Sequence, residues 1–536
     1  MRRYIQLLAF LLSLSLVLLL AGCGGSRQTI RYDLDGPVDS LDPQFTQEED
    51  AWLILANTME GLFRRGEEGK LEPGLAESYT LSEDGLVYTF TLREGLTWSV
   101  YENEAGEEVT LPLTASDFVF AFRRMMDPSG GSAYGGDYRV IQGAAAIQAG
   151  SQPVETLGVE AVDDRTLVIR LEEPSEFFLD TLANPAAAPC NEQFFEETRG
   201  RYGMDRSTIL SCGPMMVSSW DNTSRISLVP NPQYHSPQTV TMDLAALYIG
   251  RDRVQMMLDG ATDCGPVTAE NLQTMVDAGF LCQGYDDTVW GLVFNQRREE
   301  LADQRIRSAL QGAVDKSQLA GLPGVGFALT DGVVPLTALV GDQSYRDLAG
   351  AALQWVYNPT AARELLYQAL DDLGLEESPT LVLIVPQDSP AAEAAPYLQQ
   401  MWQSALSLGV DVERLEAEEF AQRLQGGEYD LALTTLSTKS PTAEGTLEAY
   451  HSQSGRNVCG YQSGEYDRLL DQARFAAQVE EAASAYARAE DLLLSEVVVC
   501  PIYQQTSYFA VARSVEGLIV SPHYNQILFY RATREG

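Results

Sequence analysis

The sequence predicts an α/β protein with two or three lobes, and three observations support this fold class. A chain of 536 residues is too long for one ordinary hydrophobic core. Its hydrophobic content of 45% and charged content of 21% are typical of globular proteins. Its later half alternates strand-like and helix-like segments, which is the pattern of parallel β-α-β units.

The alternation is clearest from residue 380 onward. Apolar runs predict three strands separated by two helices, in the order 380–386, 397–408, 410–415, 420–424 and 429–436, with Gly409 ending the first helix. In parallel sheets, ligands bind beyond the carboxyl ends of the strands. Lys439, one of three lysines in the chain, follows the last strand by three residues, so we expect it near a cleft.

The remaining elements have local signals. Thr114 and Asp117 have the spacing of a capping box and predict a helix that begins there. Period-two or helical spacing of apolar residues predicts strands over 29–34 and 86–98, a hairpin over 159–174, and helices over 52–62, 357–370 and 465–478.

The N-terminus has the pattern of a signal peptide. Arg2 and Arg3 precede an apolar run over 5–20, which is shorter than the ~20 residues a spanning helix needs. The small residues before Cys23 resemble a bacterial lipobox, which predicts a signal peptide over 1–22 and a lipidated Cys23 on a flexible tether over 23–28. The alternative is a plain signal peptide with an incidental cysteine. The lipobox places the protein on the outer side of the cytoplasmic membrane, anchored by lipid.

The net charge and the absence of catalytic motifs limit the classes of function that this chain can have. A net charge of −40, with no run of Lys or Arg longer than two, excludes a nucleic-acid partner. The chain has no nucleophile elbow, zinc-protease motif, P-loop or dinucleotide fingerprint, and paired carboxylates such as Asp286-Asp287 are too common in it to mark a site. We therefore expect an exported binding protein with no cofactor, rather than an enzyme.

Cysteine and histidine give no metal pattern. Six cysteines follow Cys23, none at C-x-x-C spacing, and both free thiols and one or two disulfides remain open. The three histidines have no partner at metal spacing and are predicted to lie on the surface: His235, His451 and His523.

An ordered series of motifs carries a family resemblance over residues 29–536. The series includes "SLDP", "EGLF", "LEPGLAESYTLSEDGLVYTFTLREGLTWS", "LTASDFVFAFRRMMDP", "LGVEAVDDRTLVIRL", "CGPM", "LVPNPQYH", "VFNQ", "RIRSAL", "NPTAARELL", "YDRLLDQA" and "CPIY". The chain resembles the large solute-binding lipoproteins of bacterial oligopeptide and dipeptide ABC importers, extracellular solute-binding protein family 5.

The resemblance implies a two-lobed periplasmic-binding-protein-like α/β fold (type II, cluster C-like) with an extra inserted domain and an interdomain ligand cleft. Its domains would be lobe I over 29–60, 184–270 and 495–536, inserted domain II over 61–183, and lobe III over 271–494. The implied function is capture of oligopeptides or a related small solute by hinge closure, followed by delivery to a membrane permease. The alternatives are a binder of a sugar, opine or metal chelate, and a peptide-sensing receptor. A monomer is expected.

Two departures from the family pattern stand out. After Trp98-Ser99, a longer acidic insert replaces the usual residues before the helix cap and need not touch ligand. Peptide-binding members carry a tryptophan–x–x–aspartate–tyrosine segment whose aspartate pairs with the ligand's α-amine. Aligning this chain without gaps puts Leu436 at the tryptophan and Lys439 at the aspartate, with Asn457 and Tyr461 on the family's asparagine and tyrosine.

A lysine repels an ammonium, so the usual amine anchor is absent from this alignment. Three interpretations remain open: Lys439 reads an acidic group, a peptide C-terminus or an N-blocked peptide; the ligand is another solute; or Lys439 points to solvent and another acid anchors the amine. The predicted ligand-binding residues are Thr435, Leu436, Ser437, Lys439, Asn457, Tyr461 and Tyr503, with Trp290 and Tyr134 as further candidates.

Overall fold

The computed structural model describes residues 28–66, 71–103, 105–175, 178–375, 378–438, 442–476, 478–521 and 526–535. An 11-stranded sheet runs through most of the molecule. Its strands lie in the order β10 (Met215–Asp221), β11 (Arg225–Pro230), β12 (Leu244–Ile249), β1 (Thr29–Leu34), β13 (Cys264–Val267), β21 (Val499–Ala512), β14 (Phe280–Phe294), β20 (Leu431–Thr435), β18 (Leu381–Pro386) and β19 (Val410–Leu415), with β15 (Phe327–Leu329) paired to β21.

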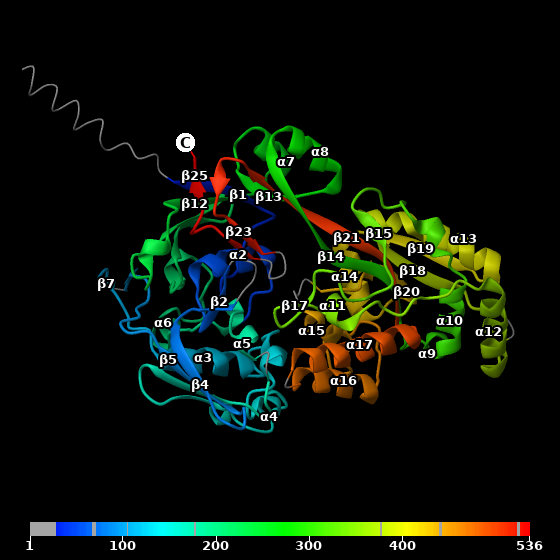
Figure 1. Ribbon diagram of the computed structural model, residues 1–536, viewed down its shortest axis with the longest axis horizontal. Helices are drawn as coiled ribbons and strands as arrows, with labels where there is room; N and C mark the ends of the chain where they lie inside the picture. The colour runs from blue at the N-terminus through cyan, green and yellow to red at the C-terminus, as the bar shows by residue number, and fades with distance from the viewer. Residues whose placement is uncertain are drawn as a thin grey trace, which may run out of the picture.

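Separate cores divide the molecule into two lobes. We call the first lobe the part whose core draws on residues 30–264 and 509–532, and the second lobe the part whose two cores draw on residues 289–503. Figure 1 shows the blue-to-green first lobe beside the yellow-to-orange second lobe, with the red C-terminal strands back in the first. The chain therefore builds one lobe, then the other, and returns.

The first lobe carries a second sheet, in the order β4 (Ala76–Leu81), β5 (Val87–Leu92), β9 (Thr166–Arg170) and β8 (Val159–Ala161). Tyr88, Phe90 and Leu92 of β5 are buried, as the period-two alternation predicts. We call residues 76–175 the side-sheet region. The helices of the first lobe are α2 (Glu49–Thr58), α3 (Ala115–Met126), α4 (Ala144–Gln148), α5 (Phe178–Thr181), α6 (Glu192–Glu197), α7 (Arg253–Leu258) and α8 (Ala269–Asp277).

The second lobe contains the predicted β-α-β units. β18 pairs in parallel with both β19 and β20, which confirms that interpretation. Helices cover both faces of this sheet, so the strands are nearly continuous apolar runs. One face holds α10 (Gln304–Gly312), α12 (Pro359–Asp372) and α13 (Ala395–Leu406), and the other holds α11 (Tyr345–Ala349), α14 (Ala417–Gly426), α15 (Ala443–Leu447), α16 (Gly464–Arg474) and α17 (Val479–Ser495), while α9 (Glu299–Ala302) precedes α10.

Small two-stranded sheets complete the structure: β2 (Phe63–Arg65) with β3 (Leu71–Pro73), β6 (Tyr101–Glu102) with β7 (Glu108–Val109), β16 (Leu339–Val340) with β17 (Gln343–Ser344), β22 (Val515–Glu516) with β25 (Thr533–Arg534), and β23 (Ile519–Ser521) with β24 (Gln526–Leu528). The acidic insert after Ser99 forms the β6–β7 hairpin, and Tyr101 packs edge-on against Phe194 of α6. None of the helices in the described ranges is long and apolar enough to cross a membrane.

Several predicted helix boundaries are wrong, including that of the helix predicted over 465–478, which ends at Arg474. α2 begins at Glu49 rather than Trp52 and ends at Thr58 rather than Leu62, because acidic residues favour its first turn and Met59 is extended. α13 ends at Leu406, where Ser407 adopts a left-handed conformation ahead of the predicted stop at Gly409.

Candidate functional site

Two long strands, β14 and β21, run between the lobes. They pair antiparallel from Phe280 with Ala512 to Val293 with Val499. Phe280 packs into a small core with α7 and α8, whereas Val293 and Val499 lie in a core of the second lobe. Figure 1 shows these two strands as the long connection between the lobes. We call their middle part, 285–291 and 503–507, the crossing segment.

The crossing segment is irregular. The pairing of β14 with β21 shifts between Asp286 and Thr288 and again between Trp290 and Gly291. A β-bulge bends its strand and redirects side chains, and bulges are frequent beside binding sites. The bends therefore occur where the lobes meet.

Two carboxylates lie at the first bulge. Thr506 Oγ1 donates to Asp286 Oδ1 at 2.5 Å, and Ser507 Oγ donates to Asp287 Oδ1 at 2.7 Å. Both aspartates are half-buried. The sequence gives no signal for them, because paired carboxylates recur throughout this acidic chain.

Trp290 is at the centre of three neighbouring strands. In the ladder it faces Thr435 of β20 on one side and Tyr503 of β21 on the other, so the structure brings these three predicted residues together. The half-buried indole donates from Nε1 to Gln505 Oε1 at 2.6 Å. Tyr503 is fully buried, and its hydroxyl donates to the Leu319 carbonyl at 2.9 Å.

The carboxyl end of β20 carries three predicted residues in three environments. Thr435 is exposed at the last position of the strand. Leu436 is 3% exposed, packs into the second lobe, and donates its backbone N–H to the Val289 carbonyl at 2.7 Å. Ser437 Oγ accepts the Val289 N–H at 2.9 Å. The chain thus stays attached to β14 for two residues beyond the strand.

Lys439 and the predicted lipidation residue Cys23 lie outside the described residues. Both assignments stay predictions.

Tyr134 lies in the side-sheet region. Its ring packs edge-on against Trp52 of α2 with centroids 5.2 Å apart, and the Trp52 Nε1 donates to its hydroxyl at 3.1 Å. That hydroxyl donates in turn to the Thr46 carbonyl. Burial raises the pKa of Tyr134 to about 12, so the phenol is neutral at physiological pH. Both rings remain partly exposed, so Trp52 is a further candidate, although its position in the sequence indicates only a helix.

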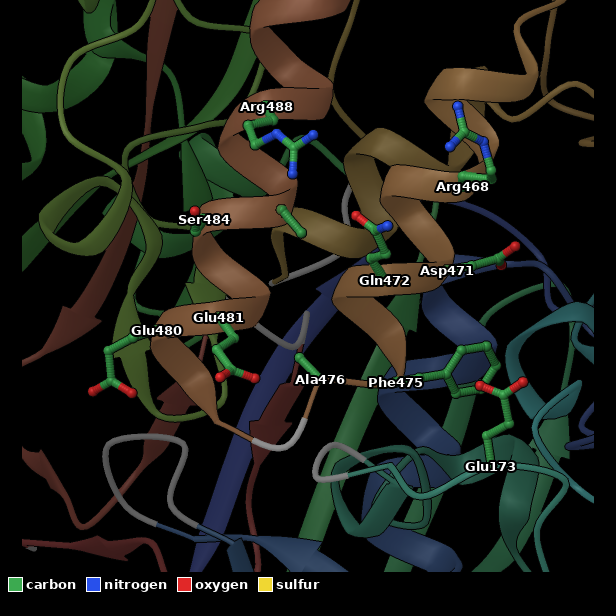
Figure 2. A pocket seen from close by; sticks show the side chains of 11 residues that line it. Glu173, Arg468, Asp471, Gln472, Phe475, Ala476, Glu480, Glu481, Ser484 and Arg488 are labelled. Atoms are coloured by element: carbon green, nitrogen blue, oxygen red, sulfur yellow. The ribbon is translucent and has the colours of Figure 1, made fainter.

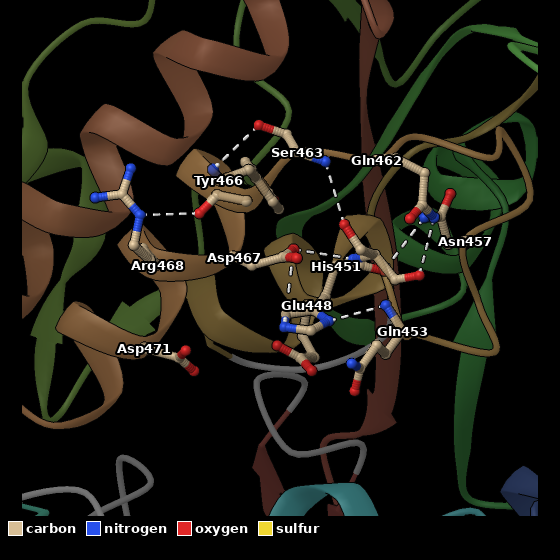
Figure 3. Close-up of polar contacts among 12 residues, drawn as sticks. Glu448, His451, Gln453, Asn457, Gln462, Ser463, Tyr466, Asp467, Arg468 and Asp471 are labelled. Atoms are coloured by element: carbon tan, nitrogen blue, oxygen red, sulfur yellow. Dashed lines mark hydrogen bonds and ion pairs between the residues drawn. The ribbon is translucent and has the colours of Figure 1, made fainter.

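Asn457 and Tyr461 use their polar atoms inside the second lobe, and Figure 3 shows Asn457 among its polar neighbours. The Asn457 amide donates to the carbonyls of His451 at 3.2 Å and Tyr461 at 2.8 Å, and its oxygen accepts the Tyr461 N–H at 3.1 Å. The Tyr461 hydroxyl donates to Glu496 Oε2 at 2.8 Å. These bonds shape the loop between α15 and α16.

The prediction that the histidines lie on the surface is wrong for His451, which is buried, while His235 is half-buried. His451 is 5% exposed, and its Nδ1 accepts the Gln453 N–H at 3.0 Å. His235 Nε2 lies 3.0 Å from Glu60 Oε1. A carboxylate and a backbone amide satisfy the imidazoles, which allows their burial. His523 lies outside the described residues.

All six cysteines after Cys23 are free thiols, which settles the open alternative against disulfides among them. Burial raises the pKa of the Cys459 thiol to about 11, so this thiol is unreactive at neutral pH. Within the part of the chain that is described, no group of three or more His, Cys, Asp or Glu side chains is placed to hold a metal ion.

Known proteins share this architecture. The chain is 26% identical over 495 residues to the dipeptide-binding protein DppE of Bacillus subtilis, covering 90% of this chain and 88% of that protein. The substrate-binding domain of an oligopeptide ABC transporter from Bacillus anthracis superposes with a TM-score of 0.77 at 25% identity, covering 96% of this chain and 99% of the other. The structure of the pheromone receptor PrgZ, reported with its mode of peptide binding, superposes with a TM-score of 0.77 at 25% identity. The match covers 95% of this chain and 100% of the other.

The family model for bacterial extracellular solute-binding proteins, family 5, matches residues 70–457. This match spans more than half of the chain and includes the side-sheet region, β14 and β20. Proteins of this family bind substrates and are not enzymes. The chain belongs to the bacterial extracellular solute-binding proteins of family 5.

Proposed function

We propose that this protein captures peptides outside the cell and delivers them to the permease of an ABC importer. The observation that carries the proposal is the family match together with relatives named for dipeptide and oligopeptide binding. The two lobes, joined by two long strands, suit a hinge that closes on a ligand.

The ligand would lie between the lobes against the crossing segment. We propose that the peptide contacts Trp290, Thr435 and Ser437, since these residues lie together where β20 ends. Thr435 is exposed, and the other two are partly exposed. An extended peptide could pair with backbone there, a mode that tolerates many side chains. Asn457, Tyr461 and Tyr503 would act by holding the surrounding loops, because their polar atoms already have partners.

The finer organisation is part of the same proposal. We propose the division that the resemblance implies, with lobe I at 29–60, 184–270 and 495–536, domain II at 61–183 and lobe III at 271–494, although residues 497–503 pack into the cores of the second lobe. Cys23 would carry the lipid anchor, and the protein would act as a monomer beside its permease. Replacing Cys23 with Ser should release the protein from the membrane fraction without changing its ligand affinity.

Lys439 is proposed to exclude ligands with a free α-amine from this position. Like charges in a desolvated cleft repel by several kcal/mol, so Lys439→Asp should increase the preference for trialanine over N-acetyl-trialanine by about tenfold or more. Calorimetry of both forms with both peptides measures this. Lys439→Gln serves as the control, because it removes the repulsion without adding an attraction. Identical preferences in all three proteins would refute the role of Lys439.

A peptide-sensing receptor is a second candidate, and the likeness to PrgZ favours it. The two functions differ in what happens after capture. An importer subunit predicts that deleting the chain abolishes uptake of labelled peptide, whereas a pure receptor predicts unchanged uptake and a lost response.

A further inference from the structure

The two lobes also touch at a place remote from the crossing segment. Phe475, the residue that follows α16, belongs to the second lobe by position, yet its ring packs against the core of the first lobe. Figure 2 shows the Phe475 ring next to Glu173, which follows β9 in the side-sheet region. A cavity of about 940 Å³ is lined by Glu173 together with residues of α16 and α17. We call this contact between the side-sheet region and α15–α17 the seam.

An ion pair crosses the same seam. Arg139 Nη2 lies 3.7 Å from Glu448 Oε1, and the two side chains are 28% and 13% exposed. Arg139 follows the 3₁₀ helix η2 (Gly135–Tyr138) of the side-sheet region, whereas Glu448 follows α15 directly. Arg474 also binds Glu448 at 2.9 Å and Glu444 at 2.8 Å, so the second lobe itself holds the Glu448 carboxylate in position.

Asp137 is the other charged group of η2 at the seam. Its carboxylate has no hydrogen bond or ion pair with any described residue and retains access to solvent. Protein atoms nevertheless crowd it, and the charges facing it from the second lobe are Arg456, Arg474, Glu444 and Glu448. On its own side, Tyr134, Tyr138 and Arg139 are the neighbouring titratable or charged residues.

We propose that the seam is a latch: the Phe475 contact and the Arg139–Glu448 ion pair hold the side-sheet region against the second lobe and so set the balance between open and closed forms before any ligand binds. The inference rests on the proposed hinge closure. Figure 1 shows β14 and β21 crossing the middle of the molecule between the lobes, with α15 and α16 of the seam below them. A hinge bend at the crossing segment that swings the second lobe away from the side-sheet region separates the seam residues.

The latch predicts a pH dependence with a defined sign. Asp137 is an exposed residue, but the protein atoms around it desolvate its carboxylate and, partly offset by Arg456 and Arg474, raise its pKa to about 6 in this conformation. In an open form, with the second lobe withdrawn, that desolvation is relieved and the pKa falls toward its usual range. The closed form then binds the proton more tightly, so closure is favoured as pH falls through about 6 and is weakened above it. Asp137→Asn removes this dependence.

X-ray scattering of the ligand-free full chain tests the latch, because no peptide is needed and failure of the peptide proposal leaves the result interpretable. Wild type should be more compact at pH 5.0 than at pH 7.5, and Asp137→Asn should be equally compact at both. Arg139→Gln and Phe475→Ala should be more expanded than wild type at pH 5.0, with a closed-to-open ratio reduced about two- to fivefold, as expected of a partly exposed ion pair or a small apolar contact.

A matched control is Arg170→Gln, which breaks the Arg170–Glu160 pair of 3.0 Å within the side sheet and should leave the radius of gyration unchanged. Glu448→Gln, alone and combined with Arg139→Gln, distinguishes loss of the ion pair from a folding defect. If the ion pair is the cause, the double variant should be no more expanded than either single variant. Equal radii for wild type and all folded variants at both pH values would overturn the latch.

Discussion

Gly291 of β14 lies against the backbone of β21 and the Leu436 side chain that follows β20. A Cβ atom there would lie 2.2 Å from the Cys500 carbonyl oxygen and 2.7 Å from Leu436 Cδ1. The first of these neighbours is backbone and cannot move aside cheaply. A side chain at position 291 would therefore collide with the β21 backbone and with Leu436.

Gly291→Ala should destabilise the protein by about 1–3 kcal/mol, because the methyl group overpacks a position bounded by backbone. Scanning calorimetry should show a lower Tm. Gly455→Ala is the matched control, since a Cβ atom at Gly455 meets nothing within 4 Å. A Gly291→Ala protein with an unchanged Tm would show that the strands can separate at little cost.

Single residues of the site were only partly predictable. The position of Thr435 at a strand end follows from local pattern, and Trp290 was an aromatic candidate without a known neighbour. The sequence could not reveal that Tyr503 bonds to Leu319 or Tyr461 to Glu496, because these partners are distant in the chain. A pattern of residue types identifies elements; it does not identify the partner that satisfies a buried hydroxyl.

At the scale of elements, the sequence predicted the strands and helix starts that depend on neighbouring residues alone. The strand over 29–34 matches β1 residue for residue, and the capping box of Thr114 and Asp117 starts α3 as expected. Helix ends were less predictable, as in α2, where the apolar pattern begins at Trp52 but the acidic residues Glu49 and Asp50 already form the first turn.

The helix α17 holds a loop through one buried carboxylate that no sequence signal marked. Glu490 accepts the backbone N–H groups of Val333 at 2.8 Å and Val334 at 3.1 Å, the Tyr345 hydroxyl at 2.9 Å, and the Arg346 guanidinium at 3.0 Å. Its side chain is 2% exposed. Five donated hydrogen bonds compensate the burial of this charge.

Glu490→Gln should therefore cost about 2–4 kcal/mol of folding stability, because the amide NH₂ faces donors and Arg346 loses its counter-charge. Unfolding in urea, followed by tryptophan fluorescence, measures the loss. Glu480→Gln is the control on the same helix: Glu480 is exposed in the first turn of α17, so the change should cost less than about 1 kcal/mol. Equal stabilities of the two variants would contradict the anchoring role of Glu490.

At the scale of the whole molecule, the family resemblance predicted two lobes and the local patterns predicted β-α-β units, but neither located the crossing strands from residue chemistry. β14 and β21 pair residues more than 200 positions apart, such as Asp286 with Thr506. No local periodicity encodes such a pairing, since it depends on where the intervening second lobe returns the chain. The net charge of −40 favours solubility and affects which partners associate with the protein, but it does not determine this topology.

The central claim is that a peptide is enclosed between the lobes at the crossing segment. Mass spectrometry of the small molecules released by denaturing protein purified from its own membranes tests it most directly, with the Gly455→Ala protein processed in parallel to confirm that recovery is reproducible. We expect peptides in near-stoichiometric amount, with blocked or absent free α-amines. Recovery of a sugar, an opine or a metal chelate in that amount, with no peptide, would contradict it.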